Sequence, residues 1–276
     1  MTVCLGLVCS SGKHILLAAD TRGTYGSVTS NDTTAKLFDL PAKFCGAVAG
    51  TLSQCEDVLS ELYHRMAQIS DTEIAPDQVR KCILDSYEQI YSGLADEALW
   101  NDFKITLEDY KHDEKLVSKL RETAREHLKS LEVDVDLIVA GFYKDSPVQL
   151  IATGGTSLKI RSEITPGNAV IGTGNIAALN WLNYRKQNIH LGLAHSLLHL
   201  TEAKQFAEVD QNVGPFRQMM LLWSGGFKPL EGGDDLMQGW WNKYGLPLSD
   251  GLEDEKHNKA VREVFGLSGQ DSLAGA

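Results

Sequence analysis

A threonine directly follows the initiator methionine, and this residue type can do chemistry in that place. Removal of the methionine, which is usual in the cytosol before a small residue, would leave a free α-amine on Thr2. An α-amine has an ordinary pKa of about 7.7–8.0, so it can accept a proton near neutral pH. Thr2 could then serve as nucleophile and base in one residue. On its own the pattern is weak, because many proteins begin with Met-Thr.

A second polar group is expected beside the start of the chain. The stretch AADTR places Asp20 and Arg22 at the end of a predicted strand, and Lys36 begins another predicted strand. A hairpin returns its second strand beside its first, so Asp20 can lie near Thr2. An ammonium group held by Asp20 could contact the Thr2 hydroxyl and favour its ionised form. The alternative is an ordinary ion pair at the surface.

A third candidate is Gly50 in AVAGTLS, where a predicted strand meets a predicted helix. Glycine lets a substrate approach the backbone closely. The N–H groups at the start of a helix can stabilise a developing oxyanion. The alternative for Gly50 is a plain tight turn.

The elements that would position these residues follow from hydrophobic periodicity. Residues 2–9 and 14–19 predict a hairpin, residues 20–34 a loop, and residues 36–40 and 44–49 a second strand pair. Strand pairs that alternate with helix pairs predict layers of sheet between layers of helix, in one α+β domain. The remaining expected strands are 135–143, 148–153, 169–171 and 219–223, and the helices are 51–69, 77–97, 176–184, 191–207 and 259–265.

Composition narrows the function classes. The chain has 276 residues and a formal net charge of −11, which disfavours binding to nucleic acids and anionic membranes. Its five cysteines contain no C-x-x-C pair, so we expect buried free thiols in a reducing compartment. The sequence shows neither a secretory signal nor an apolar run long enough to cross a membrane, and these features predict a cytoplasmic protein.

The domain organisation is expected to be simple. Residues 1–225 would form one domain that carries a charged helical insertion at about 98–131. Residues 226–276 would be a C-terminal extension that is not a separate domain.

Taken together, these residues resemble a known family. The order of Thr2, the Asp20-x-Arg22 motif, Lys36 and Gly50 is similar to the proteasome β-subunit group of N-terminal nucleophile (Ntn) hydrolases, and most to its bacterial proteasome-like and ancestral-type members. The resemblance implies a four-layer α/β/β/α sandwich, the Ntn hydrolase fold. It also implies that Thr2 is the nucleophile, that Asp20 and Lys36 tune it, and that the Gly50 N–H holds the oxyanion.

Two later motifs extend the resemblance. IGTGN places Thr173 where the family has a serine that touches the N-terminal amine, and VDQNVGP places Asp210 where an aspartate helps to orient that amine. The family's second serine position is occupied by Val213. The first hairpin is also slightly longer than in the family, so a different strand register would make Cys4 the nucleophile.

The function implied by the resemblance is threonine-type hydrolysis of amide bonds after removal of Met1, with peptides as the expected substrates. Self-association into a ring or an open helical assembly is implied as well. No cofactor, metal, nucleic acid or membrane is expected as a partner, and an ATPase partner is left open. Two alternatives remain: a catalytically inactive assembly subunit of the same fold, which Val213 favours, and a small-molecule amidohydrolase.

Two other patterns favour structural roles. VIGTGNIA resembles a dinucleotide-binding fingerprint, but the stretch that follows predicts a helix where that motif needs a strand ending in an acidic residue. His195 and His199 have a spacing that can bind a metal on a helix. They alternate with leucines of an expected core face, so we interpret them as structural.

Overall fold

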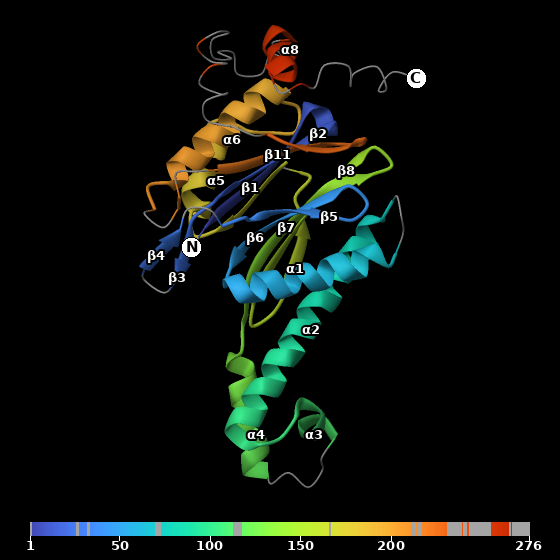
Figure 1. Ribbon diagram of the computed structural model, residues 1–276, viewed down its shortest axis with the longest axis vertical. Coiled ribbons are helices and arrows are strands. Elements are labelled where there is room, and N and C mark those ends of the chain that lie inside the picture. Colours follow the sequence, from blue (N-terminus) through green and yellow to red (C-terminus); the bar gives the residue numbers. More distant parts are fainter. Residues whose placement is uncertain are drawn as a thin grey trace.

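The computed structural model describes residues 2–25, 28–31, 34–69, 73–112, 118–165, 167–210, 213–214, 217–230, 239, 242, 255–264 and 266. Within these residues the chain is an α+β protein with two antiparallel sheets of five strands each (Figure 1). Helices pack on both sheets, an arrangement consistent with a sandwich.

The first sheet has the N-terminal strand β1 in its interior. All seven residues of β1 are buried, because both faces of this strand are covered. The antiparallel register pairs Val3 with Gly172 on one side and Cys4 with Ala19 on the other. The strand order is β10 (Asn168–Gly172), β1 (Val3–Cys9), β2 (His14–Asp20), β11 (Arg217–Trp223) and β12 (Gly226–Pro229).

The second sheet is connected to the first helix of the chain through its strand β6. Its third strand in chain order is the long strand β7, and β6 ends at Gly50 just before the first helix. The order is β5 (Leu37–Leu40), β6 (Phe44–Gly50), β7 (Val133–Tyr143), β8 (Ser146–Gly155) and β9 (Lys159–Ser162).

Three clusters of buried hydrophobic side chains hold the layers together. One joins the first sheet to α5 (Asn175–Tyr184) and α6 (Leu193–Ala207). The second joins the second sheet to α1 (Leu52–Ala67) and α2 (Pro76–Phe103). The third lies between the sheets and contains side chains of both, such as Leu17 and Ile138. Burial of apolar surface in these layers is what fixes the two sheets face to face.

The far end of α2 carries an arm that points away from the sheets (Figure 1). It consists of the last turns of α2 with α3 (Leu107–His112) and α4 (Ser118–Ser130). The Tyr91 hydroxyl of α2 donates to the Leu128 carbonyl of α4 at 3.2 Å. The helical insertion predicted at about 98–131 falls on this arm.

Most predicted elements of the body are confirmed. The first hairpin is present as β1 and β2, joined by a short 3-10 turn at Ser10–Gly12, and α1, α5 and α6 match predicted helices. No helix among the described residues is long and apolar enough to cross a membrane.

Three expectations about the elements were wrong. The predicted loop at 20–34 contains a two-stranded ribbon, β3 (Gly23–Tyr25) with β4 (Val28–Asn31). The edge strands β9 and β12 were not predicted, because these short, largely solvated segments form by pairing with a neighbouring strand and lack an apolar alternation. The helix predicted at 77–97 continues to Phe103, since Leu99 is still buried.

The C-terminal segment contributes to the first sheet. β12 pairs with β11. Ala260 and Val261 of α8 (Glu255–Val264) belong to the buried cluster that joins the first sheet to α5 and α6. The predicted boundary at residue 225 stays a prediction.

Candidate active site

Thr2 lies just before β1 and is buried, with 4% of its surface exposed. Its carbonyl oxygen accepts hydrogen bonds from the Gly174 N–H at 3.3 Å and from the Thr173 hydroxyl at 3.4 Å. Both donors belong to the turn between β10 and α5. The neighbouring Gly172 has φ +86°, and a Cβ there would lie 2.2 Å from the Thr2 carbonyl oxygen. Only glycine allows this close approach, so the turn holds Thr2 by its backbone.

Asp20 ends β2 and is completely buried. Its Oδ1 accepts from the Val3 N–H at 2.9 Å and from Lys36 Nζ at 3.0 Å. Its Oδ2 accepts from the Arg22 N–H at 3.1 Å and from the Gly214 N–H at 3.0 Å. Donors from separate segments therefore fix the orientation of this carboxylate, as a buried charge requires.

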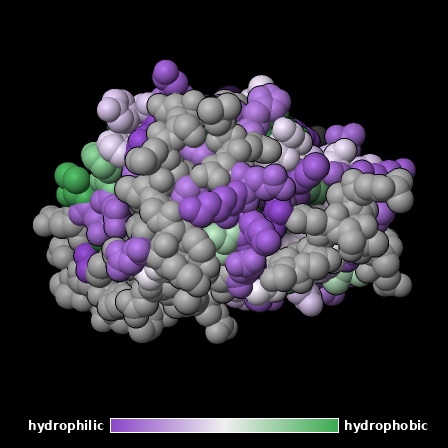
Figure 2. Space-filling model, turned by 90° about the horizontal axis from the view of Figure 1, so that it is seen from above, coloured by the Kyte–Doolittle hydropathy of each residue, from purple (hydrophilic) through white to green (hydrophobic). Residues whose placement is uncertain are grey.

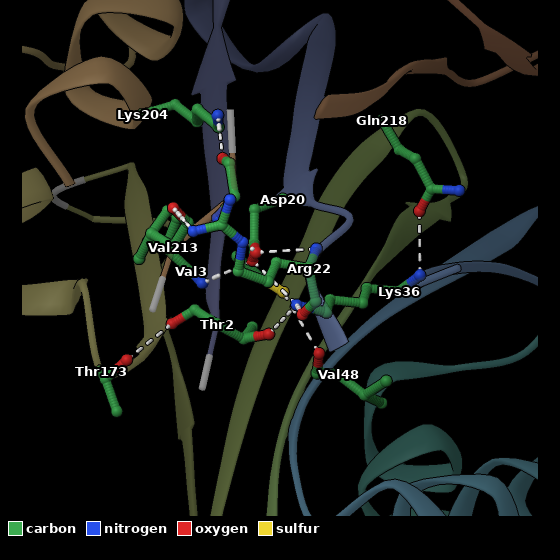
Figure 3. A network of polar contacts seen from close by, with 12 residues as sticks. Thr2, Val3, Asp20, Arg22, Lys36, Val48, Thr173, Lys204, Val213 and Gln218 are labelled. Carbon is green, nitrogen blue, oxygen red and sulfur yellow. Dashed lines mark hydrogen bonds and ion pairs between the residues drawn. The ribbon is translucent and has the colours of Figure 1, made fainter. Parts of the chain in front are cut away.

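Lys36 directs its ammonium group at the Thr2 hydroxyl (Figure 3). Nζ donates to Thr2 Oγ1, to Asp20 Oδ1 at 3.0 Å and to the Arg22 carbonyl at 2.6 Å. A lysine ammonium has three donors and no acceptor, so these partners use all of them. The hydroxyl of Thr2 thus accepts a bond from a cation, and a positive charge beside a hydroxyl stabilises the oxyanion that forms when its proton leaves.

The backbone around Lys36 explains how its side chain is aimed. Its N–H donates to Gln218 Oε1 at 2.8 Å, and its carbonyl accepts from the Val48 N–H at 3.1 Å. Gln218 belongs to β11 of the first sheet, whereas Val48 belongs to β6 of the second. The backbone of Lys36 is therefore hydrogen-bonded to one strand of each sheet.

A cavity of about 200 Å³ opens beside the Thr2 hydroxyl. Gly50, at the end of β6, lines this cavity. Its φ is +134°, and a Cβ at this position would lie only 2.1 Å from the Asp134 carbonyl oxygen. Glu56 of α1 is exposed at the same cavity. The remaining wall is mostly apolar and consists of Ala35, Phe38, Val48, Ala49, Leu52, Cys55 and Leu59, with Thr34.

The structure thus brings Thr2, Asp20, Lys36 and Gly50 to one place, with Thr173 beside them. Thr173 contacts the Thr2 carbonyl. Asp210 is half-buried, and its carbonyl accepts the Val213 N–H at 2.9 Å in the turn that leads to Gly214. The expected contacts of Thr173 and Asp210 with a terminal amine stay predictions, because they concern the chain after removal of Met1.

The alternative nucleophile Cys4 is placed differently. Its side chain is completely buried between the sheets and donates to the Val48 carbonyl at 3.3 Å. Burial, together with the nearby Asp20 carboxylate, raises the pKa of the Cys4 thiol far above its ordinary value. Of these two candidates, Thr2 is among the residues that line the cavity and Cys4 is not.

The glycine-rich pattern and the histidine pair, both interpreted as structural, lie at the start of α5 and on α6. The Gly174 N–H, which a dinucleotide site would use, bonds the Thr2 carbonyl. His195 and His199 are buried, and His199 Nδ1 lies 2.8 Å from Gln187 Oε1. Among the residues that the structure describes, no group of three or more histidine, cysteine or acidic side chains could hold a metal.

Some contributors were missed from the sequence. Gln218 and Lys204 were not predicted, and neither was the role of the Arg22 carbonyl as an acceptor, because these contacts depend on how separate elements pack together. Gly214 was noted only as part of a motif, and its N–H proves to be a donor to Asp20.

The Thr2 hydroxyl thus lies beside a buried pair of Lys36 and Asp20, and the Lys36 ammonium donates to it. This arrangement suits a nucleophilic threonine. Over 61 residues the chain is 36% identical to a proteasome subunit beta of Methanosphaera stadtmanae. This match covers 22% of this chain and 29% of that protein. The chain therefore resembles a proteasome β subunit over a limited part of each protein's length. Proteasome β subunits belong to the Ntn hydrolase superfamily. No family model matches it.

Proposed function

We propose that this protein is a threonine-type Ntn hydrolase that cleaves amide bonds, with peptides as substrates, after Met1 has been removed. The observation that carries the proposal is the hydrogen bond from Lys36 Nζ to Thr2 Oγ1, made by an ammonium that Asp20 and the Arg22 carbonyl hold in place. The limited similarity to a proteasome subunit beta supports the same reaction class.

The proposed reaction uses the groups around Thr2. Oγ1 attacks the substrate carbonyl, and its proton passes to the freed α-amine of Thr2. The Lys36 ammonium stabilises the negative charge that develops on Oγ1, and the Gly50 N–H is assigned to the substrate oxyanion. The C–N bond then breaks, and the departing amine takes the proton. Water attacks the resulting ester, releases the acid and returns a proton to Oγ1.

We further propose that the cavity beside Thr2 receives a substrate side chain. Its wall is apolar apart from Thr2, Thr34, Lys36 and the exposed Glu56, and such pockets bind a side chain mainly by excluding water. The proposed fold is the four-layer α/β/β/α sandwich of Ntn hydrolases. The packing of α5 and α6 on one sheet and of α1 and α2 on the other supports it.

Self-association into a ring or an open helical assembly is also proposed. Large apolar side chains are exposed along α5 and just after α6, where Ile176 is 72%, Tyr184 73% and Val209 84% exposed. Next to them, Trp181 and Phe206 stack at 3.8 Å. On the face seen in Figure 2, hydrophilic side chains predominate among the coloured residues, and strongly hydrophobic ones are visible at the left edge. Exposed apolar patches of this kind mark protein contacts.

Light scattering tests the assembly. The wild-type protein is expected to have a mass of several subunits, and Ile176→Glu combined with Val209→Glu is expected to reduce it toward that of a monomer. Tyr63→Glu is the matched control, because Tyr63 is an exposed aromatic residue of α1 on the other side of the molecule. A monomeric wild-type protein contradicts the proposal.

Intact-mass spectrometry with a threonine-directed epoxyketone tests the catalytic proposal. The expected result is a chain that lacks Met1 and gains one adduct, which peptide mapping assigns to Thr2. A retained Met1 with no adduct contradicts the proposal and favours the inactive assembly subunit, in which Val213 replaces the family's serine. Adduct formation with turnover of acyl-amides but of no peptide would identify a small-molecule amidohydrolase.

A further inference from the structure

Lys204 of α6 is a completely buried lysine that has no part in the reaction proposed above. Its Nζ donates to the Gly214 carbonyl and forms an ion pair with Glu208 at 2.6 Å. Glu208 is partly exposed, whereas Lys204 is entirely shielded from water. Burying an ammonium group costs several kcal/mol more than burying an apolar side chain of similar size, so a buried lysine is poor evidence for added stability.

The segment that Lys204 holds is attached to the candidate active site at its other end. The peptide unit between Val213 and Gly214 has its N–H bonded to Asp20 Oδ2 at 3.0 Å, and its carbonyl accepts from Arg22 Nη1 at 3.5 Å. A Cβ on Gly214 would lie 2.7 Å from the Arg22 Cβ, so the segment is packed tightly against Arg22. In Figure 3, Lys204 approaches this network from the side away from Thr2 and Lys36.

The bonds therefore form a continuous series from helix α6 to the threonine. Lys204 holds the Gly214 carbonyl, the Gly214 N–H holds Asp20, Asp20 holds Lys36, and Lys36 holds the Thr2 hydroxyl. Each link is a hydrogen bond in which at least one partner carries charge, and such bonds are stronger and more directional than neutral ones.

We infer that Lys204 is a positioning residue for the reaction of Thr2, acting through Gly214 and Asp20 on the Lys36 ammonium. This inference rests on the proposed function. Without the Lys204 ammonium, the Gly214 segment can shift, one of the donors to Asp20 is weakened, and Lys36 is aimed less accurately at Oγ1. The effect falls on the chemical step, because Lys204 does not line the cavity that is proposed to receive substrate.

Lys204→Met tests the inference, because methionine keeps most of the buried stem and removes the donor. We expect kcat for a fluorogenic peptide to fall about 10-fold, which corresponds to about 1.4 kcal/mol, with KM nearly unchanged. Glu208→Gln is the matched control. It removes the charge of the partly exposed partner, but the glutamine amide oxygen can still accept from the Lys204 ammonium, which keeps its bond to Gly214, so kcat is expected to stay close to wild type.

Residue-resolved hydrogen exchange supplies a second measurement that does not depend on turnover. The Gly214 and Val3 amides donate to Asp20, and we expect both to exchange faster in Lys204→Met than in Glu208→Gln. A merely structural role would lower the melting temperature of Lys204→Met without changing kcat below that temperature. Such a result, with unchanged exchange at Gly214, would overturn the inference.

Failure of the inference is distinguishable from failure of the proposed function. A wild-type protein that forms no epoxyketone adduct and cleaves no amide refutes the function, and the exchange rates then decide whether Lys204 orders the donors to Asp20. An active wild type with an equally active Lys204→Met refutes the positioning role alone. In an Asp20→Asn background, Lys204→Met is expected to cause little further loss, because both changes act on one series of bonds.

Discussion

Replacing Thr2 with alanine is expected to lower kcat/KM for a fluorogenic peptide by at least about 10³-fold, to the level of the assay background. The change removes Oγ1, which accepts from Lys36 and is the nucleophile of the proposed reaction. The α-amine and the Asp20–Lys36 pair remain, so binding and folding should change little. Initial rates measured at equal enzyme concentration, with circular dichroism on the same samples, check both statements.

Two controls make this result specific to the hydroxyl. Thr2→Ser keeps the nucleophile and the amine, and it should retain measurable activity. Cys4→Ala removes the other candidate nucleophile, whose thiol is buried and carries a raised pKa, and it should retain near wild-type turnover if the protein folds normally. Full activity in Thr2→Ala, or adduct formation on Cys4, would show that the nucleophile has been assigned to the wrong residue.

Replacing Lys36 with methionine is expected to impair both activity and stability. Loss of the ammonium beside Oγ1 should lower kcat about 10²–10³-fold, the size seen when a preorganised charge stabiliser is removed. The free energy of unfolding should fall by about 3–5 kcal/mol, because the completely buried Asp20 carboxylate loses its cationic partner. Peptide hydrolysis and urea unfolding, measured on the same preparations, check the two effects.

A double-mutant cycle separates the ion pair from general packing. Asp20→Asn combined with Lys36→Met removes both charges, so its loss of stability should be clearly smaller than the sum of the single losses. Lys13→Met is the surface control, since Lys13 is exposed at the first hairpin, and it should change stability by less than about 0.5 kcal/mol. Additive losses in the cycle would mean that Asp20 and Lys36 do not depend on each other as their 3.0 Å contact implies.

The main candidate residues were accessible from the sequence because their signals are local. The buried strand at residues 3–9 and its partner at 14–20 follow from continuous apolar text interrupted by a short turn, and hairpin geometry then places Asp20 beside the chain start. Lys36 and Gly50 were found by spacing and by resemblance, since Lys36 begins one predicted strand and Gly50 directly follows another. Gly172 belongs to VIGTGNIA, the motif that resembles a dinucleotide-binding fingerprint but is followed by a predicted helix where that motif needs a strand.

Other features of the candidate site could not be predicted from local patterns. The four donors to Asp20 come from β1, the residues after β2, Lys36 and Gly214, which are far apart along the chain. Gln218 accepts from the Lys36 N–H because β11 pairs with β2 in the first sheet. This pairing brings Gln218 close to Lys36, which is far from it in the sequence. The short ribbon formed by β3 and β4 was likewise missed, because polar residues with glycine predict a loop unless a partner strand is known.

By itself, the sequence determined most strands and helices of the body, the two candidate nucleophiles Thr2 and Cys4 at the chain start, and the acidic net charge. These follow from periodicity and residue chemistry over short distances. Only the tertiary structure decided that Thr2 rather than Cys4 lines the cavity, that the Lys36 ammonium is held by Asp20 and Arg22, and that Lys204 supports this arrangement from α6. The physical reason is that a hydrogen-bond direction depends on how separate elements are packed, and burial in the sheet and helix layers fixes that packing.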